Sequence, residues 1–453
     1  TSLPDLGGSG DTVFFLASEM KPQAPSNLLV DGLTPLSDSG KKALLDWVKR
    51  CRKFVQWNRV FSYGGTDLII YRQGVARPGE PNKPGNGNLV GATECEPLYV
   101  AAIAVHTDAV DTRIAFAEPI GSGRITPSEF FSAYDPIALI NGGFFSGPRP
   151  LGTMLLDGVH AGKPIVGRSA IGWNNSDGTF SFGRGNAKIG AKTKRGYVEF
   201  TKFNVPPPPD EAALYTPDVA RSSIGIGLDS LQIVLVNDVV AEVREAREGK
   251  FLMPEGGTMM IARGKARAMF DPVQPGEKIK VLTDWENGSF GASTNLIQAG
   301  PMLIRENKFT TDTETFKDDV LEKRHPRTIV GTDGKRMIWA VVDGRSAIHS
   351  RGATISETRW IAKSLGLTTA INMDGGGSSQ IMWRGVMMNL PADGKERPLP
   401  YAVMMLPKGM KLVRANSYLN GPDQGEFGEY GYNASEEGVA EYMDTYDPMS
   451  TKN

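Results

Sequence analysis

The feature that most constrains the fold is a long succession of short apolar runs, each interrupted by glycine, that extends from Leu98 to about Leu406. Runs such as 99–105 and 112–116 have the length and residue types of strands. None approaches the ~18 to 20 apolar residues that a membrane helix needs. The 53 glycines and 30 prolines are typical of a loop-rich globular protein. We therefore expect an α+β fold, a mixed, β-sheet-rich single domain over residues 97–407 with peripheral helices.

The two flanks of this main domain differ from it. Apolar residues in 41–54 have helical spacing, and the Gly/Pro/Asn-rich stretch 76–91 predicts a long loop. We interpret residues 1–96 as an N-terminal accessory region. Residues 408–453 have few aliphatic side chains after Asn416 and form the expected C-terminal tail. Association of the chain into a homo-oligomer through either flank stays open.

The charge of the chain is nearly balanced, with 50 basic and 51 acidic side chains and a formal net charge of −1. This balance gives no general attraction for nucleic acid or an anionic membrane, so an anionic ligand must be held by a local cluster. The first residues contain no basic stretch followed by an apolar segment. Either no signal peptide is present or Thr1 follows a processing or cloning boundary. Cys51 and Cys95 are compatible with one disulfide and equally with two free thiols.

One helix has clear boundaries in the sequence. Thr354 has the residue type of an N-cap, apolar residues up to Leu365 fall near one face, and Gly366 can adopt the left-handed conformation that ends helices. These signals predict a helix over residues 355–365.

Three five-residue segments, 168–172, 221–225 and 327–331, resemble one another. An Asp-Gly pair follows the first and the third, at 177–178 and 333–334, and supplies the positive φ angles that tight hairpin turns require. We interpret each segment as part of a β-hairpin. A weak internal repeat and independent use of the same hairpin chemistry both stay open.

Two predicted strands end in glycine-rich loops that carry polar side chains. One apolar run leads into Asp374, three glycines and Ser378, and the run 137–140 leads into Asn141 and two glycines. Exposed NH groups in such loops can cradle phosphate oxygens, and asparagine can bind a sugar hydroxyl or a phosphate. In isolation, the first loop favours a glycine-rich turn in which Asp374 accepts backbone NH groups, and the neighbouring motifs shift this balance toward a ligand site.

Cationic side chains are concentrated in neighbouring loops. His325 and Arg327 precede one apolar strand, Asp343 and Arg345 follow the next, and Arg351 lies in the loop after that. Guanidinium groups match phosphate oxygens in a bidentate fashion. Each cluster alone is usually a solvated surface feature, and an ion pair between Asp343 and a nearby arginine is the alternative to a catalytic role for this carboxylate.

In their order and kind, these motifs resemble the N-acetylglucosamine-1-phosphodiester α-N-acetylglucosaminidases, the phosphodiester glycosidase family of the lysosomal uncovering enzyme and its bacterial relatives. The resemblance implies a glycoside hydrolase that cleaves a sugar-1-phosphodiester at the anomeric carbon of a glycan or bacterial surface polymer. It also implies an extracytoplasmic or secreted setting. The matching stretches are 141–145, 156–158, 300–301, 324–331, 341–345, 350–352 and 372–379.

The expected chemistry follows from the leaving group. A departing phosphate monoester needs little protonation, so stabilising it and supplying a nucleophile or a base at the anomeric carbon are the main tasks. We expect Asp374 to act at that carbon, with Asp343 as the other candidate. The expected catalytic residues are Asp374, Asp343 and His325, and the expected substrate-binding residues are Asn141, Gly142, Gly143, Arg327, Arg345, Arg351, Gly375, Gly376, Gly377 and Ser378.

We expect no metal and no cofactor, because the four histidines show no zinc-ligand spacing. Calcium or magnesium held by carboxylates stays open. Three other functions also stay open: a phosphodiesterase that cleaves the phosphorus–oxygen bond, a glycosidase for an unphosphorylated polysaccharide, and a non-catalytic carbohydrate-binding protein of a cell wall or phage tail.

Overall fold

The computed structural model describes residues 37–51, 57–73, 97–117, 123–216, 224–225, 229–245, 250–251, 257–288, 290–346 and 349–410. Within these ranges strands dominate, in several sheets, and five α-helices accompany them. This architecture confirms the predicted α+β, sheet-rich fold. No helix in the described ranges is long and apolar enough to cross a membrane.

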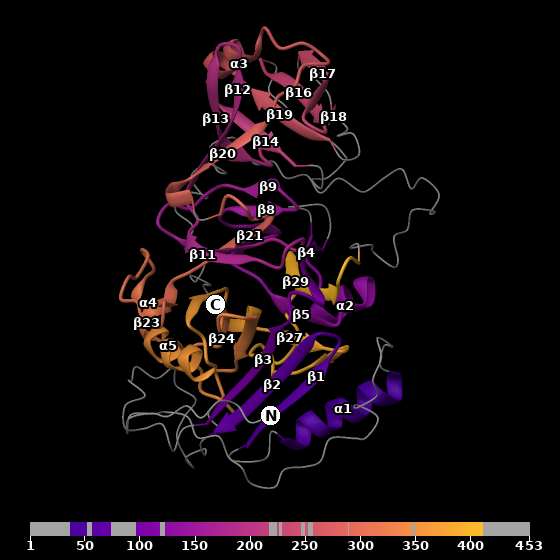
Figure 1. Ribbon diagram of the computed structural model, residues 1–453, viewed down its shortest axis with the longest axis vertical. Coiled ribbons are helices and arrows are strands. Elements are labelled where there is room, and N and C mark those ends of the chain that lie inside the picture. The colour runs from indigo at the N-terminus through magenta and orange to yellow at the C-terminus, as the bar shows by residue number, and fades with distance from the viewer. Residues whose placement is uncertain are drawn as a thin grey trace.

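An eight-stranded antiparallel sheet forms the base of the molecule in Figure 1. The residues of β3 and β25, at its centre, are all buried, which explains why their sequences are continuous apolar runs rather than alternating ones. In order across the sheet, the strands are β1 (Trp57–Tyr63), β2 (Thr66–Gln73), β3 (Leu98–Val105), β25 (Met337–Val342), β24 (Arg327–Thr332), β26 (Thr369–Asn372), β22 (Met302–Arg305) and β23 (Lys308–Phe309).

Strands β1 and β2 belong to the predicted accessory region 1–96, yet they form one edge of this sheet. β2 pairs with β3 along its whole length, from Thr66 opposite Val105 to Gln73 opposite Leu98. Helix α1 (Asp38–Cys51) covers most of the stretch that was predicted to be helical. The boundary predicted at residue 97 therefore does not coincide with a break in the sheet. The predicted loop 76–91, Cys95 and the tail from residue 411 lie outside the described residues.

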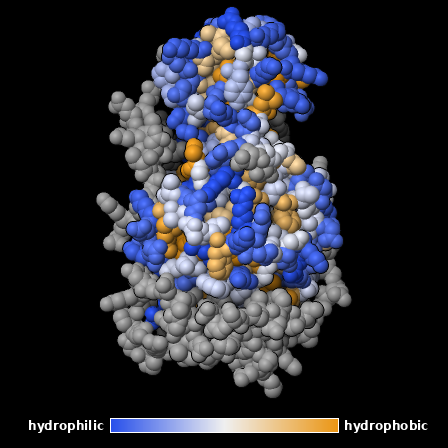
Figure 2. Space-filling model, turned by 60° about the vertical axis from the view of Figure 1, so that its left-hand side comes forward, coloured by the Kyte–Doolittle hydropathy of each residue, from blue (hydrophilic) through white to orange (hydrophobic). Residues whose placement is uncertain are grey.

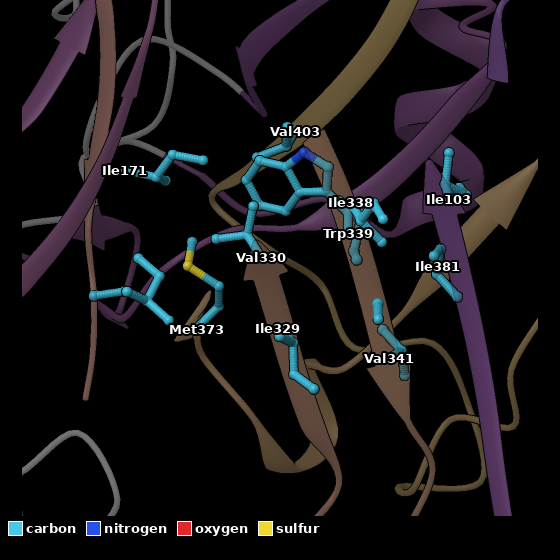
Figure 3. Packing of buried hydrophobic residues seen from close by; sticks show 14 of the residues in the cluster. Ile103, Ile171, Ile329, Val330, Ile338, Trp339, Val341, Met373, Ile381 and Val403 are labelled. Carbon is cyan, nitrogen blue, oxygen red and sulfur yellow. The ribbon is translucent and has the colours of Figure 1, made fainter. Parts of the chain in front are cut away.

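Two five-stranded sheets pack near the main sheet. Side chains from all three meet in one core, where Ile171 of one sheet and Val403 of another lie near the buried Trp339 of β25 (Figure 3). One sheet consists of β28 (Val386–Met387), β27 (Ile381–Trp383), β5 (Ala138–Asn141), β29 (Tyr401–Pro407) and β4 (Val110–Phe116). The other consists of β11 (Phe180–Arg184), β10 (Ser169–Trp173), β21 (Asn295–Gln298), β8 (Met154–Leu156) and β9 (Val159–Gly162).

A distal lobe is inserted into the second of these sheets, because the chain leaves it after β11 and returns to it at β21. The lobe has its own hydrophobic core, which includes Phe200, Met260 and Phe270, and it forms the top of Figure 1. Figure 2 shows it as a separate bulge above a narrower waist. Its seven strands are β17 (Val239–Glu245), β16 (Leu231–Val236), β19 (Thr258–Ala262), β14 (Ala212–Tyr215), β13 (Gly196–Phe203), β12 (Ala187–Thr193) and β20 (Val281–Trp285), with helix α3 (Gly264–Phe270) packed on β19 and β13.

Short elements complete the described structure. Helix α2 (Pro127–Tyr134) packs against β5, and helix α4 (Asp318–Glu322) packs against helix α5 (Ile355–Ser364). The remaining elements are β6 (Phe145–Ser146) paired with β7 (Arg149–Pro150), β15 (Ile224–Gly225) paired with β18 (Lys250–Phe251), and the 3-10 helices η2 (Glu286–Gly288) and η3 (Gly376–Ser378).

The local predictions of helix and hairpins can be compared directly with these elements. α5 begins at a capping box between Thr354 and Glu357, and Gly366 beyond its end has φ of 79°, so the predicted helix is confirmed. β10 pairs with β11 and β24 pairs with β25 as antiparallel hairpins, as predicted. The second segment differs, because its described residues, 224–225, pair with Lys250–Phe251 rather than with a strand directly after a tight turn.

Candidate active site

The two glycine-rich loops meet at the ends of β5 and β26. The backbone NH of Asp374 donates to the carbonyl of Gly142 at 3.2 Å. The side-chain Nδ2 of Asn141 donates to the Asp374 carbonyl at 2.9 Å. Two segments that are 233 residues apart in the sequence thus form one continuous floor.

Asn141 connects these loops and is not available to a substrate. Its side chain is 1% exposed. The Oδ1 atom accepts hydrogen bonds from Thr328 Oγ1 at 2.9 Å and from the Gln380 NH at 3.2 Å. Both the oxygen and the nitrogen of the Asn141 amide therefore have partners within the protein. The predicted contact of this side chain with sugar or phosphate is wrong. Its role is to position the two loops.

The loop glycines are needed for close packing. A Cβ on Gly142 would collide with the Tyr401 ring, and a Cβ on Gly375 would lie 2.7 Å from the Pro326 carbonyl oxygen. Gly376 has φ of 61°, a conformation that side chains other than glycine rarely adopt. Its backbone NH donates to Pro326 at 2.9 Å, which fixes the loop against the segment that carries His325.

Asp374 lies at the centre of the floor and is 8% exposed. Its Oδ1 accepts a hydrogen bond from the Gly375 NH at 2.9 Å. Burial raises the pKa of Asp374 to about 6, against the opposing effects of the Ser378 hydroxyl, the Arg397 charge and the Gly375 NH. A carboxyl group that is buried, has a raised pKa and keeps a small exposed area is a strong candidate for acid–base or nucleophilic chemistry.

Two guanidinium groups lie over the glycine loop. Arg345 Nη2 would be 3.0 Å from a Cβ on Gly376, and Arg397 occupies the space that a Cβ on Gly377 would need. Arg397 also donates from Nη1 to Ser378 Oγ at 3.4 Å. Both side chains keep solvent access, with exposed fractions of 39% for Arg345 and 31% for Arg397. Two cationic groups therefore lie over the glycines that follow Asp374, the residue whose carboxyl pKa is raised.

Asp393 orients this pair of arginines. Its Oδ2 accepts from Arg397 Nε at 2.8 Å, and its Oδ1 lies 3.7 Å from Arg345 Nη1. Arg397 is held further by Gln380, whose Oε1 accepts from the Arg397 NH at 2.9 Å. Neither Asp393 nor Arg397 was predicted as a site residue, because both lie in a polar stretch whose spacing marks no motif. Only the fold brings this stretch over the glycine loop.

His325 is neutral and largely buried, with 12% of its side chain exposed. Burial, helped by the charges of Arg327 and Arg345, lowers its pKa to about 4. Its Nε2 lies 3.2 Å from the carbonyl oxygen of Asp319. Because a carbonyl can only accept, Nε2 carries the proton and Nδ1 has the lone pair. This Nδ1 atom has no hydrogen-bond partner among the described residues.

Arg327 does not bind phosphate as predicted. The side chain is 1% exposed, and its guanidinium donates to the carbonyls of Ala353 and Val320, each at 2.7 Å, and to that of Lys323 at 2.9 Å. The bonds to Val320 and Lys323 satisfy carbonyls at the end of α4, whereas the Ala353 carbonyl lies in another loop and also accepts from the His325 NH. Burial lowers the pKa of Arg327 to about 9, so the group is still cationic at neutral pH.

Asp343 is a structural anchor rather than a second catalytic carboxylate. It is 1% exposed, and Oδ2 accepts from His349 Nε2 at 2.7 Å and from the Leu390 NH at 2.8 Å. Oδ1 accepts from Asn389 Nδ2 at 2.8 Å. The partner is therefore a histidine, not one of the arginines considered in the sequence. Arg72 Nη1 lies 3.3 Å from His349 Nδ1, which must accept, so His349 donates from Nε2 to the carboxylate.

The remaining predicted ligands differ in position. Ser378 is 1% exposed and lies between Asp374 and Arg397, within the site. Arg351 is half-buried in the next loop, where its backbone NH donates to Pro97 at 3.0 Å. Its predicted phosphate contact stays a prediction. In the described part of the chain, no three His, Cys, Asp or Glu side chains are grouped so that they could hold a metal ion.

Comparisons with known proteins find similarity over part of the chain. Residues 230–406, which include Asp374, Arg345, Asp393 and Arg397, match the family model described as Phosphodiester glycosidase. The SPbeta prophage-derived uncharacterized protein YomE of Bacillus subtilis (strain 168) is 37% identical over 105 residues. That match spans 23% of this chain and only 16% of the relative.

Two of the matching solved structures share the fold. A hypothetical protein from Synechocystis has a TM-score of 0.58 at 21% identity, and the match covers 77% of this chain and 63% of that one. A Burkholderia pseudomallei K96243 protein named "Putative exported protein" has the same TM-score at 17% identity, with 78% and 97% covered. The auto-inhibited catalytic domain of zebrafish N-acetylglucosamine-1-phosphodiester alpha-N-acetylglucosaminidase matches with a TM-score of 0.35 at 13% identity, covering 74% and 88%. Over residues 230–406, the chain is thus similar to the phosphodiester glycosidase family.

Proposed function

We propose that this protein is a glycoside hydrolase that cleaves a sugar-1-phosphodiester bond at the anomeric carbon, in a glycan or a bacterial surface polymer. The observation that carries the proposal is the placement of Asp374, with its raised pKa, near the charge of Arg397, while Arg345 lies over Gly376 of the same loop and both guanidinium groups are solvent-accessible. The family match over residues 230–406 supports the reaction type.

In this proposal, the two arginines bind the phosphate group and stabilise it as it leaves. Arg345 and Arg397 are oriented by Asp393 and present planar donors toward the open side of the loop. Guanidinium forks bind phosphate oxygens in a bidentate fashion and stabilise the negative charge that accumulates on the departing monoester. Because that monoester leaves as an anion, a strong general acid is not required. The two arginines thus take the place that a protonated carboxyl group has in ordinary glycosidases.

Asp374 is the residue that we propose acts on the sugar. Its carboxylate acts at the anomeric carbon, either as the nucleophile or as the base for an attacking water. As nucleophile, it forms a bond to that carbon while the bond to the phosphate oxygen breaks and its electron pair leaves with the phosphate. As base, it takes a proton from water, whose oxygen forms the new bond. The stereochemistry of the released sugar separates the two, since the first route retains and the second inverts the configuration.

His325 is the second group with unused acid–base capacity. The Nδ1 atom of its neutral imidazole is buried and has no partner among the described residues, so it can take a proton from a water that attacks a glycosyl-enzyme bond only when that water is admitted next to it. We propose this role only for the route in which Asp374 is the nucleophile. The setting that we propose is extracytoplasmic, because glycosyl phosphates of this kind occur in surface polymers and secreted glycans.

The experiment is to incubate wild type and Asp374→Asn with α-glycosyl-1-phosphate diesters and bacterial surface polymers, with and without a chelator. Mass spectrometry and phosphorus NMR identify the products. Free sugar and a phosphate monoester from wild type alone, in both conditions, would support the proposed reaction without a metal. The matched control is Asp238→Asn, an exposed aspartate in the distal lobe whose φ of 62° asparagine tolerates.

Other products would point to other functions. Release of a sugar-1-phosphate would mean that the phosphorus–oxygen bond is cleaved. Turnover of unphosphorylated polysaccharide alone would assign an ordinary glycosidase. Equal activity of Asp374→Asn and wild type, with the fold intact, would remove Asp374 from the mechanism.

A further inference from the structure

The outer face of the distal lobe carries an exposed aromatic side chain that the proposed reaction does not use. Tyr197 of β13 is 45% exposed, and Leu282 of β20 is 40% exposed. Both strands pair with β12, which lies between them. The lobe is far along the molecule from the loops of the main sheets (Figure 1).

The Tyr197 ring lies against the middle of β12. A Cβ on Gly190 would be 2.5 Å from Tyr197 Cζ and 2.6 Å from its hydroxyl oxygen, so the ring covers the surface that the glycine leaves bare. Glu199, not Tyr197, is directly opposite Gly190 in the register, so the ring crosses diagonally between strands. One side of the Tyr197 ring covers the glycine backbone, and almost half of the residue is exposed. We call the outward side of this ring the platform, since it is flat and apolar.

Charged side chains of both signs surround this platform. Lys192 is opposite Tyr197, Asp284 is opposite Lys188, and Glu199 is opposite Gly190, which places all of them on one face because directly paired residues share a face. Glu199 and Asp284 lie close enough that their charges, after burial, raise the pKa of Tyr197. The hydroxyl is therefore protonated at neutral pH and can donate.

These charged groups are not used within the lobe. Among the described residues, Lys188, Lys192, Glu199 and Asp284 form no ion pair or side-chain hydrogen bond. Elsewhere in the same lobe, charged side chains do pair: Arg263 donates to Asp229 at 2.8 Å and Arg267 to Glu245 at 2.7 Å. The platform thus has two unused cationic donors, two unused carboxylate acceptors and no net charge.

We propose that this face, defined by Tyr197, Leu282, Lys188, Lys192, Glu199 and Asp284, binds a neutral polysaccharide chain. The apolar CH face of a pyranose ring matches a flat aromatic ring. Its hydroxyls both donate and accept, as the surrounding lysines and carboxylates require. A polyanion would gain no net electrostatic attraction from a face without net charge, and a largely apolar partner would leave four charges desolvated without partners. This proposal is independent of the reaction proposed for the distant loops.

A purely structural role for Tyr197 is the competing explanation, since an aromatic ring that covers a strand glycine stabilises a sheet by itself. Tyr197→Leu separates the two. Leucine keeps apolar cover over Gly190 but has no aromatic face and no hydroxyl. Tyr197→Phe keeps the face and loses only the hydroxyl.

The test is an NMR titration of the full chain with cellohexaose, maltohexaose and chitohexaose, in an Asp374→Asn background so that turnover does not interfere. We expect at least one probe to bind with a Kd on the order of 1 mM. Tyr197→Leu should weaken binding roughly fivefold or more, and Tyr197→Phe should change it less. The matched control is Phe309→Ala, which removes an aromatic side chain of 37% exposure from the main body and should leave binding unchanged.

The proposal is overturned if none of the three probes binds, or if Tyr197→Leu binds as tightly as its parent. If Tyr197→Leu does not fold, the double variant Lys192→Ala and Glu199→Ala replaces it, and unchanged affinity in that variant has the same meaning. Because binding is read without catalysis, failure of the phosphodiester reaction would leave this result intact, and the reverse also holds.

Discussion

Replacing Asp374 with asparagine should abolish turnover and at the same time stabilise the fold at neutral pH. The pKa of Asp374 rises from 3.8 to about 6 on folding because burial disfavours its charged form. Each tenfold change in the acid dissociation constant corresponds to about 1.4 kcal/mol, so ionised Asp374 costs the folded state roughly 3 kcal/mol. Asparagine has no charge to desolvate, and its Oδ1 can still accept from the Gly375 NH.

The sign of the pH dependence follows from linkage. Below pH 3.8 the carboxyl is protonated in both states, and the wild type suffers no penalty. As pH rises toward about 6, the unfolded chain has already lost this proton while the folded one retains it, so wild-type stability falls. The stability difference between Asp374→Asn and wild type should therefore be small near pH 4, grow across this window and level off near pH 7.

Thermal and urea unfolding of both proteins across this pH range measures the difference. Asp238→Asn is the control, because it removes one carboxylate from an exposed turn and should shift stability little at any pH. A variant that is no more stable than wild type at neutral pH would refute the reasoning. So would a stability gain that does not change with pH, since it would not arise from ionisation.

Three further outcomes are expected. The kcat/KM of wild type should fall tenfold per pH unit well below the Asp374 pKa of about 6, because the ionised form is required, and a profile that stays flat down to about pH 5 would contradict this. Arg397→Lys should lower kcat/KM roughly 10- to 100-fold with little loss of stability, as measured by steady-state kinetics beside thermal unfolding, because lysine cannot bind both Asp393 and a phosphate in a bidentate fashion. Asp343→Ala should destabilise by about 3 kcal/mol in urea unfolding, since it leaves His349 and Asn389 without their acceptor, and equal stability would show that this network is not needed.

The fold class and several local elements followed from the sequence because their causes are local. Thr354, Glu357 and Gly366 lie within one or two turns of the helix that they delimit. Asp-Gly pairs determine hairpin turns through their own φ angles, and this was sufficient for β10–β11 and β24–β25. A strand buried on both faces shows as a continuous apolar run, so the central strands were recognisable without their partners.

The position of Asp374 was predictable for a related reason. A carboxylate that follows an apolar run and precedes three glycines predicts a strand end and a glycine-rich loop from local sequence alone. The similar Asn141 loop indicated a second strand end. What the sequence could not show was which polar atoms already have partners. Asn141, Arg327 and Asp343 are all buried and bonded to the protein, and nothing in their residue types distinguishes them from ligands of a substrate.

Only the tertiary structure decided the rest of the site. Arg397 and Asp393 reach the glycine loop because β27, β28 and the segment after them fold back over it, and contacts of this kind leave no periodic signal in the chain. The raised pKa of Asp374 likewise depends on how much protein surrounds it. By itself, the sequence determined the local elements and the chemical types of the loops. The structure determined which side chains are free to act, because burial and hydrogen bonding are properties of residues distant in sequence that packing brings together.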